Sequence, residues 1–309
     1  MAIRNRKQRE SDAAPEGAEW KGKKRVWIAL WIFLAAVLTV AVYFAVTGVL
    51  IPDSRYKAAV DLYDAGRYDE AIAAFTALNG YQDSEAMLEK CRIGKKAAEE
   101  TEALVRSIHV GDIYLFGAYE QDNKPSNGKE DIEWIVLEKD GTSLLLISKY
   151  ALDCQQYISS YTSVTWESSA LRSWLNGRFL DTAFRPEEQA HIRSTTVAAD
   201  ENPSYGTSPG NDTTDKVFLL SIPEATRYFP SDEARKCIPT EYTIAQGVYR
   251  SRTCTLDGIP TCWWWLRSPG NDPCYAADVN RAGTVYEYGN YVSRNTGGIR
   301  PALWIDLGA

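Results

Sequence analysis

Histidine and cysteine are the residue types here that could support nucleophilic, redox or metal chemistry. The chain has two histidines, His109 and His191, among 309 residues. A Ser/His/Asp hydrolase would need one of them, and neither stands near the glycines of a nucleophile elbow. We therefore interpret both as surface residues and assign no catalytic residue. Whether the chain is an enzyme stays open, with a non-enzyme favoured.

The six cysteines all follow residue 52: Cys91, Cys154, Cys237, Cys254, Cys262 and Cys274. None of their spacings is Cys-x-x-Cys, so a zinc site or a thioredoxin-like site has no support. Many disulfide pairings are open, and Cys254–Cys262 is the favoured local bridge.

Oxygen ligands crowd residues 200–215, namely Asp200, Glu201, Asn202, Asn211, Asp212 and Asp215. Carboxylate and amide oxygens suit calcium, but the spacing of an EF-hand loop is absent. A solvated acidic loop is the preferred interpretation, and no cofactor or metal is assigned.

The stretch 271–296 carries binding chemistry. Tyrosine supplies rigid amphipathic contact area, and serine and asparagine supply adaptable hydrogen bonds. The alternative is that these residues serve tight turns and exposed strands. We predict a ligand-binding face made of Asn271, Asp272, Tyr275, Asn280, Arg281, Tyr286, Tyr288, Asn290, Tyr291, Ser293, Arg294 and Asn295.

Short strands and small helices must position this face. Apolar runs at 112–116 and 132–137 predict strands, and Asp140-Gly141 predicts a hairpin turn into a strand at 143–148. A short helix is expected at 168–175. This pattern predicts an α+β domain over 109–309.

Three arginines and two tryptophans are expected to hold the domain together. We predict that Arg172, Arg267 and Arg300 fix loops through bonds to carboxylates or backbone carbonyls. Trp166 and Trp174 flank the short helix and are expected in the core.

Residues 52–108 read as helical. Amphipathic patterns at 56–63 and 69–78, separated by Gly66, resemble one tetratricopeptide unit, and a third helix is expected at 84–107. Such units generally need neighbours to bury their faces. A helical stalk is therefore preferred over a peptide-binding groove.

The apolar run at 26–51 carries no charged residue and predicts a single transmembrane helix. Basic residues precede it, so residues 1–25 are predicted to be a cytoplasmic tail and the C-terminal domain to be extracellular. A buried core helix and a cleaved signal peptide are the alternatives. The net charge of −7 argues against a nucleic-acid partner.

Four stretches carry a family resemblance: 165–176, 215–221, 264–270 and 298–303. They resemble an uncharacterised domain common at the C-termini of proteins from gut Firmicutes. That domain is similar to the C-type-lectin-like fold, in the branch that contains the formylglycine-generating enzymes. The resemblance implies a lectin-like fold for about 110–309. The branch's active-site cysteines have no counterpart that we can place here.

The stretch 271–296 also resembles the variable region of lectin-fold proteins that retroelements diversify. The leading expectation is thus a membrane-anchored recognition protein for a protein or glycan ligand. The alternatives are an enzyme of the formylglycine-generating type, or a degenerate relative, and a structural envelope scaffold.

Overall fold

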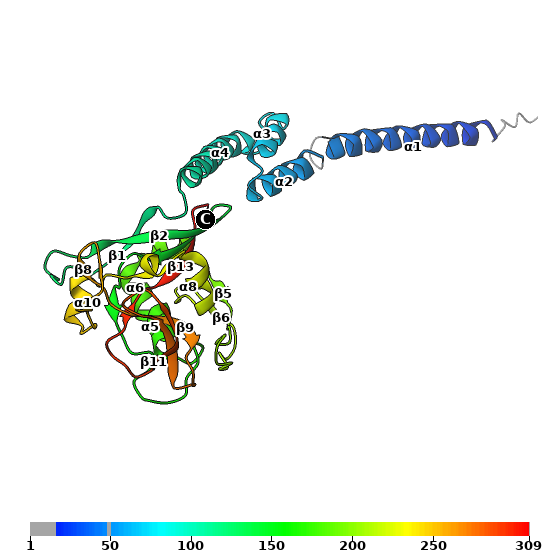
Figure 1. Cartoon of the computed structure of the whole chain (residues 1–309). Helices are drawn as coiled ribbons and strands as arrows, with labels where there is room; N and C mark the ends of the chain where they lie inside the picture. The colour runs from blue at the N-terminus through cyan, green and yellow to red at the C-terminus, as the bar shows by residue number, and fades with distance from the viewer. Residues whose placement is uncertain (1–16, 48–50, 309) are drawn as a thin grey trace, which may run out of the picture. The chain divides into compact units, whose positions relative to one another are not determined.

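The structure, a computed structural model, describes residues 17–47 and 51–308 (Figure 1). The chain forms two compact units, Met1–Ala97 and Ala98–Ala309. The division falls inside helix α4 (Ser84–Ser107), shortly before the predicted domain start at residue 109.

The predicted transmembrane helix is contradicted. The run 26–51 overlaps α1 (Gly17–Ala45) and the first residue of α2 (Ile51–Asp64), and its residues 48–50 lie outside the described residues. Within residues 17–47 and 51–308, no helix has both the length and the apolar character needed to cross a membrane. The extracellular location was deduced from that helix and stays a prediction. Of the predicted tail, residues 1–16 lie outside the described residues.

The helical pair expected after residue 52 is present as α2 and α3 (Tyr68–Ala77), followed by α4. Gly66 takes a positive φ of 71° at the turn between α2 and α3, a conformation that glycine adopts without a Cβ penalty. Phe75 is fully buried, and the Tyr56 ring meets it edge-on at 5.6 Å between centroids. Buried side chains around Phe75 therefore give this unit a core of its own.

The C-terminal unit contains two main sheets (Figure 1). The first is antiparallel, and the predicted hairpin at Asp140-Gly141 joins two of its strands. Its order is β1 (Ile113–Tyr119), β2 (Glu130–Asp140), β3 (Ser143–Ser148) and β13 (Ala302–Asp306). The last strand of the chain therefore completes a sheet that begins at the start of the domain.

The second sheet carries the C-terminal half of the domain. Its order is β11 (Val285–Tyr291), β10 (Tyr275–Val279), β9 (Trp264–Pro269), β12 (Gly298–Ile299) and β4 (Asp153–Cys154). Two small ribbons pair β5 (Thr195–Val197) with β6 (Thr213–Asp215), and β7 (Thr255–Leu256) with β8 (Ile259–Pro260). The short helices are α5 (Ala170–Trp174), the π-turn η2 (Leu175–Phe179), α6 (Leu180–Ala183), α7 (Pro186–His191), α8 (Ile222–Tyr228), α9 (Asp232–Arg235) and α10 (Glu241–Ala245).

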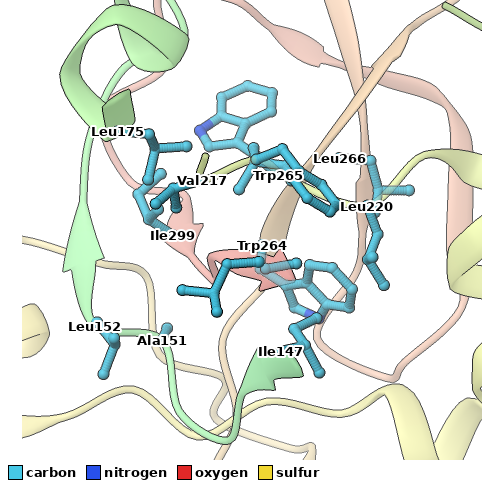
Figure 2. Packing of buried hydrophobic residues seen from close by; sticks show 14 of the residues in the cluster. Ile147, Ala151, Leu152, Leu175, Val217, Leu220, Trp264, Trp265, Leu266 and Ile299 are labelled. Atoms are coloured by element: carbon cyan, nitrogen blue, oxygen red, sulfur yellow. The ribbon is translucent and has the colours of Figure 1, made fainter. Parts of the chain in front are cut away.

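Strand β9 lies at the centre of the core. Trp264 and Trp265 have no exposed surface, and aliphatic side chains such as Leu220, Leu266 and Ile147 gather around them (Figure 2). Such rings bury large apolar areas and dominate the energetics of a core. The burial of these two rings therefore holds β9, and with it the second sheet, against the core.

Polar bonds complete the packing in the way predicted for Arg172, Arg267 and Arg300, the last of which donates to the Ser148 carbonyl. Arg172 Nε donates to Asp215 at 2.6 Å, and Trp166 Nε1 donates to the same carboxylate at 2.9 Å. Arg267 Nη2 donates to Glu224 at 2.9 Å, so it fixes α8 to β9. Asp215 thus joins the short helix to the β5–β6 ribbon.

We expect Asp215→Ala to lower the free energy of unfolding by about 3 kcal/mol, because removing one partner leaves buried donors unpaired. Asp215 is 2 % exposed and accepts from Trp166, Arg172 and Thr213. Urea unfolding measures the change. The exposed Asp181→Ala is the control, with a change within about 0.5 kcal/mol. Equal stabilities for the two variants would contradict this role.

Candidate functional site

A cavity of about 440 Å³ opens beside strands β10 and β11. Its walls combine aromatic rings with amide, carboxylate and guanidinium groups, a combination typical of ligand sites. The lining residues are Tyr249, Trp263, Asp278, Asn280, Arg281, Tyr286, Asn290, Arg294 and Thr296. We call it the β10–β11 cavity.

An irregular strand pairing positions the polar groups of this cavity. Asp278 pairs with Tyr286 and Ala276 pairs with Asn290, so the register slips between the two pairs. Gly289 lies in the slip with a φ of 80°, and a Cβ there would lie 2.4 Å from the Ala276 carbonyl oxygen. A bulge of this kind redirects neighbouring side chains. Here it brings Asn290 Nδ2 within 2.8 Å of Asp278 Oδ2.

Asp278 supplies the carboxyl group of the cavity wall. The residue is only 1 % exposed to solvent. Burial raises the pKa of its carboxyl to about 7, although the Asn290 hydrogen bond and the Arg294 charge both oppose the rise. A carboxyl with this pKa can accept or donate a hydrogen bond near neutral pH, and such perturbed groups concentrate at functional sites.

Tyrosines form a continuous cluster next to the cavity. The Tyr275 ring lies 4.6 Å from Tyr291 and 5.5 Å from Tyr288, centroid to centroid. Tyr286 meets Tyr288 at 6.0 Å and links the cluster to the cavity wall. The tyrosine cluster comprises Tyr161, Tyr205, Tyr275, Tyr286, Tyr288 and Tyr291. Five of its members are exposed, while Tyr275 is half-buried at its centre.

The structure brings most of the predicted binding face together. Asn280, Arg281, Tyr286, Asn290 and Arg294 line the cavity, and Tyr275, Tyr288 and Tyr291 belong to the tyrosine cluster. The remaining four lie in neither feature: Asn271, Asp272, Ser293 and Asn295.

All four have local bonds. Asp272 Oδ1 accepts from the Cys274 N–H in a turn, and the Asn271 N–H donates to the Tyr288 carbonyl. The Ser293 carbonyl accepts from Gln156, and the Asn295 carbonyl accepts from the Cys154 thiol.

Asp278 and Trp263 line the cavity but were missed by the sequence reasoning. Asp278 stands in the run Tyr275-Ala-Ala-Asp-Val279, where a lone carboxylate among buried strand residues was the available signal. Tyr249 comes from a loop far away in the sequence, and no local pattern predicts its approach.

The oxygen-bearing side chains of residues 200–215 bond to several different partners. Asn202 Oδ1 accepts from the Ser204 and Tyr205 N–H groups, while Asp212 accepts from Ala199. Asp215 serves Trp166 and Arg172 as described above.

Another acidic group, Glu120, Asp122 and Glu130, brings its carboxylates within 4.8 Å of one another. These carboxylates already accept backbone N–H groups, from Gln121 to Glu130 and from Lys124 to both Glu120 and Asp122. Their local bonds explain the gathering without a cation.

The favoured Cys254–Cys262 bridge is wrong. All six cysteines, which lie within the described residues, are free thiols. Cys262 instead lies opposite Cys237 across two antiparallel segments. Of the histidines, His109 is exposed as predicted, whereas His191 is half-buried with Nδ1 2.9 Å from the Asp306 carbonyl oxygen.

A larger cavity of about 670 Å³ lies between β1 and residues 181–188. Three of its charged side chains already have partners in the cavity wall, since Arg185 pairs with Glu188 at 2.9 Å and Lys129 donates to the Thr182 carbonyl. The β10–β11 cavity differs because it contains a buried carboxyl with a displaced pKa. We therefore take the smaller cavity as the candidate site.

Comparison with known sequences gives one family. A family described as Domain of unknown function (DUF6273) matches residues 141–307, more than half of the chain. This agrees with the predicted uncharacterised C-terminal domain. No curated protein and no solved structure matches the chain. The lectin-like fold, the Firmicutes origin and the diversification stay predictions.

We expect Asp278→Asn to change how stability depends on pH. The folded pKa of Asp278, about 7, lies above the ordinary carboxyl value. The folded state therefore binds the proton more tightly, and its stability falls as pH rises toward 7. From pH 5 to pH 8 the wild-type protein should lose about 2 kcal/mol relative to Asp278→Asn. Urea unfolding of both proteins at the two pH values measures this. A difference that does not vary with pH would contradict the assignment.

Proposed function

Since the chain belongs to the DUF6273 family, whose function is unknown, we propose from its geometry that the domain recognises a ligand, and that a glycan binds in the β10–β11 cavity. The observation that carries the proposal is the buried Asp278 carboxyl beneath aromatic walls. The cavity needs no cofactor for this role, and the acidic chain gives no support to a nucleic-acid ligand.

The composition of the walls favours a sugar. The rings of Tyr249, Trp263 and Tyr286 offer flat apolar surfaces for the C–H face of a sugar ring. Asp278 and Asn290 offer paired acceptors and donors for its hydroxyl groups. Planar polar groups at fixed positions give orientation, while the rings give contact area.

The guanidinium groups refine the ligand class. Arg281 and Arg294 line the same cavity, and Arg294 Nη1 lies 3.4 Å from Asn290 Oδ1. The cavity is lined by two guanidinium groups and one carboxyl, so its positive groups outnumber its acidic one. This favours a ligand that carries a negative charge, because a guanidinium binds two carboxylate or sulfate oxygens at once. An acidic glycan therefore fits better than a neutral one.

A protein ligand is the second candidate. The exposed tyrosine cluster supports it, because clustered tyrosines supply rigid contact area at protein interfaces. Cys262, by contrast, lines neither the β10–β11 cavity nor the β1 cavity, so neither cavity would present a peptide substrate to it.

We expect Asn290→Ala and Arg294→Ala to weaken glycan binding at least about tenfold each, because each removes a hydrogen-bonding group from the cavity. The full chain is applied to an array of acidic and neutral glycans and to a peptide array, and affinities of hits are then measured by calorimetry. Arg106→Ala, an exposed arginine on α4, is the matched control and should bind like the wild type.

Binding to acidic glycans that both cavity variants reduce would support the proposal. Saturable binding to peptides alone, lost in Tyr288→Ala, would assign the face to a protein ligand. An absence of saturable binding on both arrays would overturn recognition as the function.

A further inference from the structure

A buried arginine lies beside two buried thiols, apart from the β10–β11 cavity. Arg300 is 1 % exposed, and the rings of Phe229 and Trp264 each lie 5.1 Å from its Cζ. Its Nε donates to the Ser148 carbonyl at 2.7 Å, whereas Nη1 has no hydrogen-bond partner. A guanidinium stays protonated in a protein, so this site holds a positive charge away from water.

The charge needs an anion, and the titratable groups that act on Arg300 are the thiols of Cys237 and Cys262. No carboxylate among the described residues forms an ion pair with Arg300. A buried cation without a counter-ion is strongly unfavourable, so ionisation of one thiol would neutralise the site. Such a thiolate would also be the reactive form of cysteine.

The backbone holds the two thiols in a register that suits a disulfide. Cys237 and Cys262 face each other across an antiparallel bridge, and the Cys262 N–H donates to the Cys237 carbonyl at 2.9 Å. Directly opposed residues in such pairs have Cα atoms about 4.5–5.5 Å apart, within the range that disulfides span. Both residues are at most 1 % exposed.

We propose that Cys237, Cys262 and Arg300 form a reversible dithiol site, in which Cys237 is the thiolate paired with Arg300 and attacks a small organic disulfide, and Cys262 completes a cross-strand bond.

The neighbouring charges agree with this choice of thiolate. Arg300 and the Cys262 bond hold the pKa of Cys237 below its usual value despite burial, while the same bond raises the pKa of Cys262. Burial and Asp153 raise the pKa of Cys154, the third thiol nearby, to about 12.

The exchange balances in two steps. The Cys237 thiolate attacks one sulfur of the small disulfide, whose S–S bond breaks and releases one thiolate. Cys262 then gives its proton to solvent and attacks the Cys237 sulfur, and the second small thiolate leaves. The two cysteines lose two electrons and the small disulfide gains them. Because the new bond is uncharged, Arg300 loses its counter-ion, so the bond should be easily reduced.

The first test detects the thiolate by its ultraviolet absorbance in the full chain at pH 7. We expect the absorbance to fall by one thiolate in Cys237→Ser and to stay unchanged in Cys154→Ser, with tryptophan fluorescence reporting the fold. Equal absorbance in the wild type and a folded Cys237→Ser would overturn the proposal.

The second test treats the full chain with oxidised glutathione and maps the products by mass spectrometry. We expect a Cys237–Cys262 linked peptide that reduced glutathione reopens, also in the double variant Cys254→Ser/Cys274→Ser. The rate should change less than about threefold from pH 6 to pH 8, because the thiolate is already present, whereas an ordinary thiol would give roughly 100-fold. Another pairing, no linkage, or a 100-fold rise would overturn the proposal.

Discussion

The burial of strand β9 along its whole length is the constraint on which the domain depends. Every residue from Trp264 to Pro269 is buried. The indole N–H groups of Trp264 and Trp265 find backbone acceptors, the Arg235 and Gln155 carbonyls, each at 3.1 Å. Arg267 satisfies its charge against Glu224. Because β9 is buried on both faces, it can pair in only one register, and this register sets how the adjacent strands pair.

The position of the proposed site depends on how β10 pairs with β9. Asp278 on β10 pairs directly with Trp265 on β9, so its carboxyl is held at the inner side of the sheet where water is scarce. The bulge at Gly289 then turns Asn290 toward it. Strand β11 is the edge of its sheet, and its tyrosines are exposed there. One rigid strand thus supports a buried polar group on its neighbour and an adaptable aromatic face at the edge.

The features that depend on neighbouring residues alone were predicted from the sequence. The hairpin at Asp140-Gly141, the short helix near Trp174 and the carbonyl contact of Arg300 follow from turn chemistry, periodicity and the geometry of guanidinium. The transmembrane prediction was wrong because no helix within residues 17–47 and 51–308 is both long enough and apolar enough to cross a membrane.

Long-range pairing could not be predicted in the same way. The choice of Cys262 as a partner for Cys254 relied on closeness in sequence, yet β-pairing sets Cys262 against Cys237. The same lack of register information hid Asp278, whose place in the cavity depends on where β11 lies.

Crystallographic screening with small polar and sugar-like fragments tests whether the β10–β11 cavity is a ligand site, because it compares this cavity with the larger one beside β1 without assuming a ligand. The account predicts that fragments bind in the β10–β11 cavity, with polar atoms within hydrogen-bond distance of Asp278 and Asn290. Fragments that bind only in the larger cavity beside β1, leaving Asp278 without a contact, would contradict it.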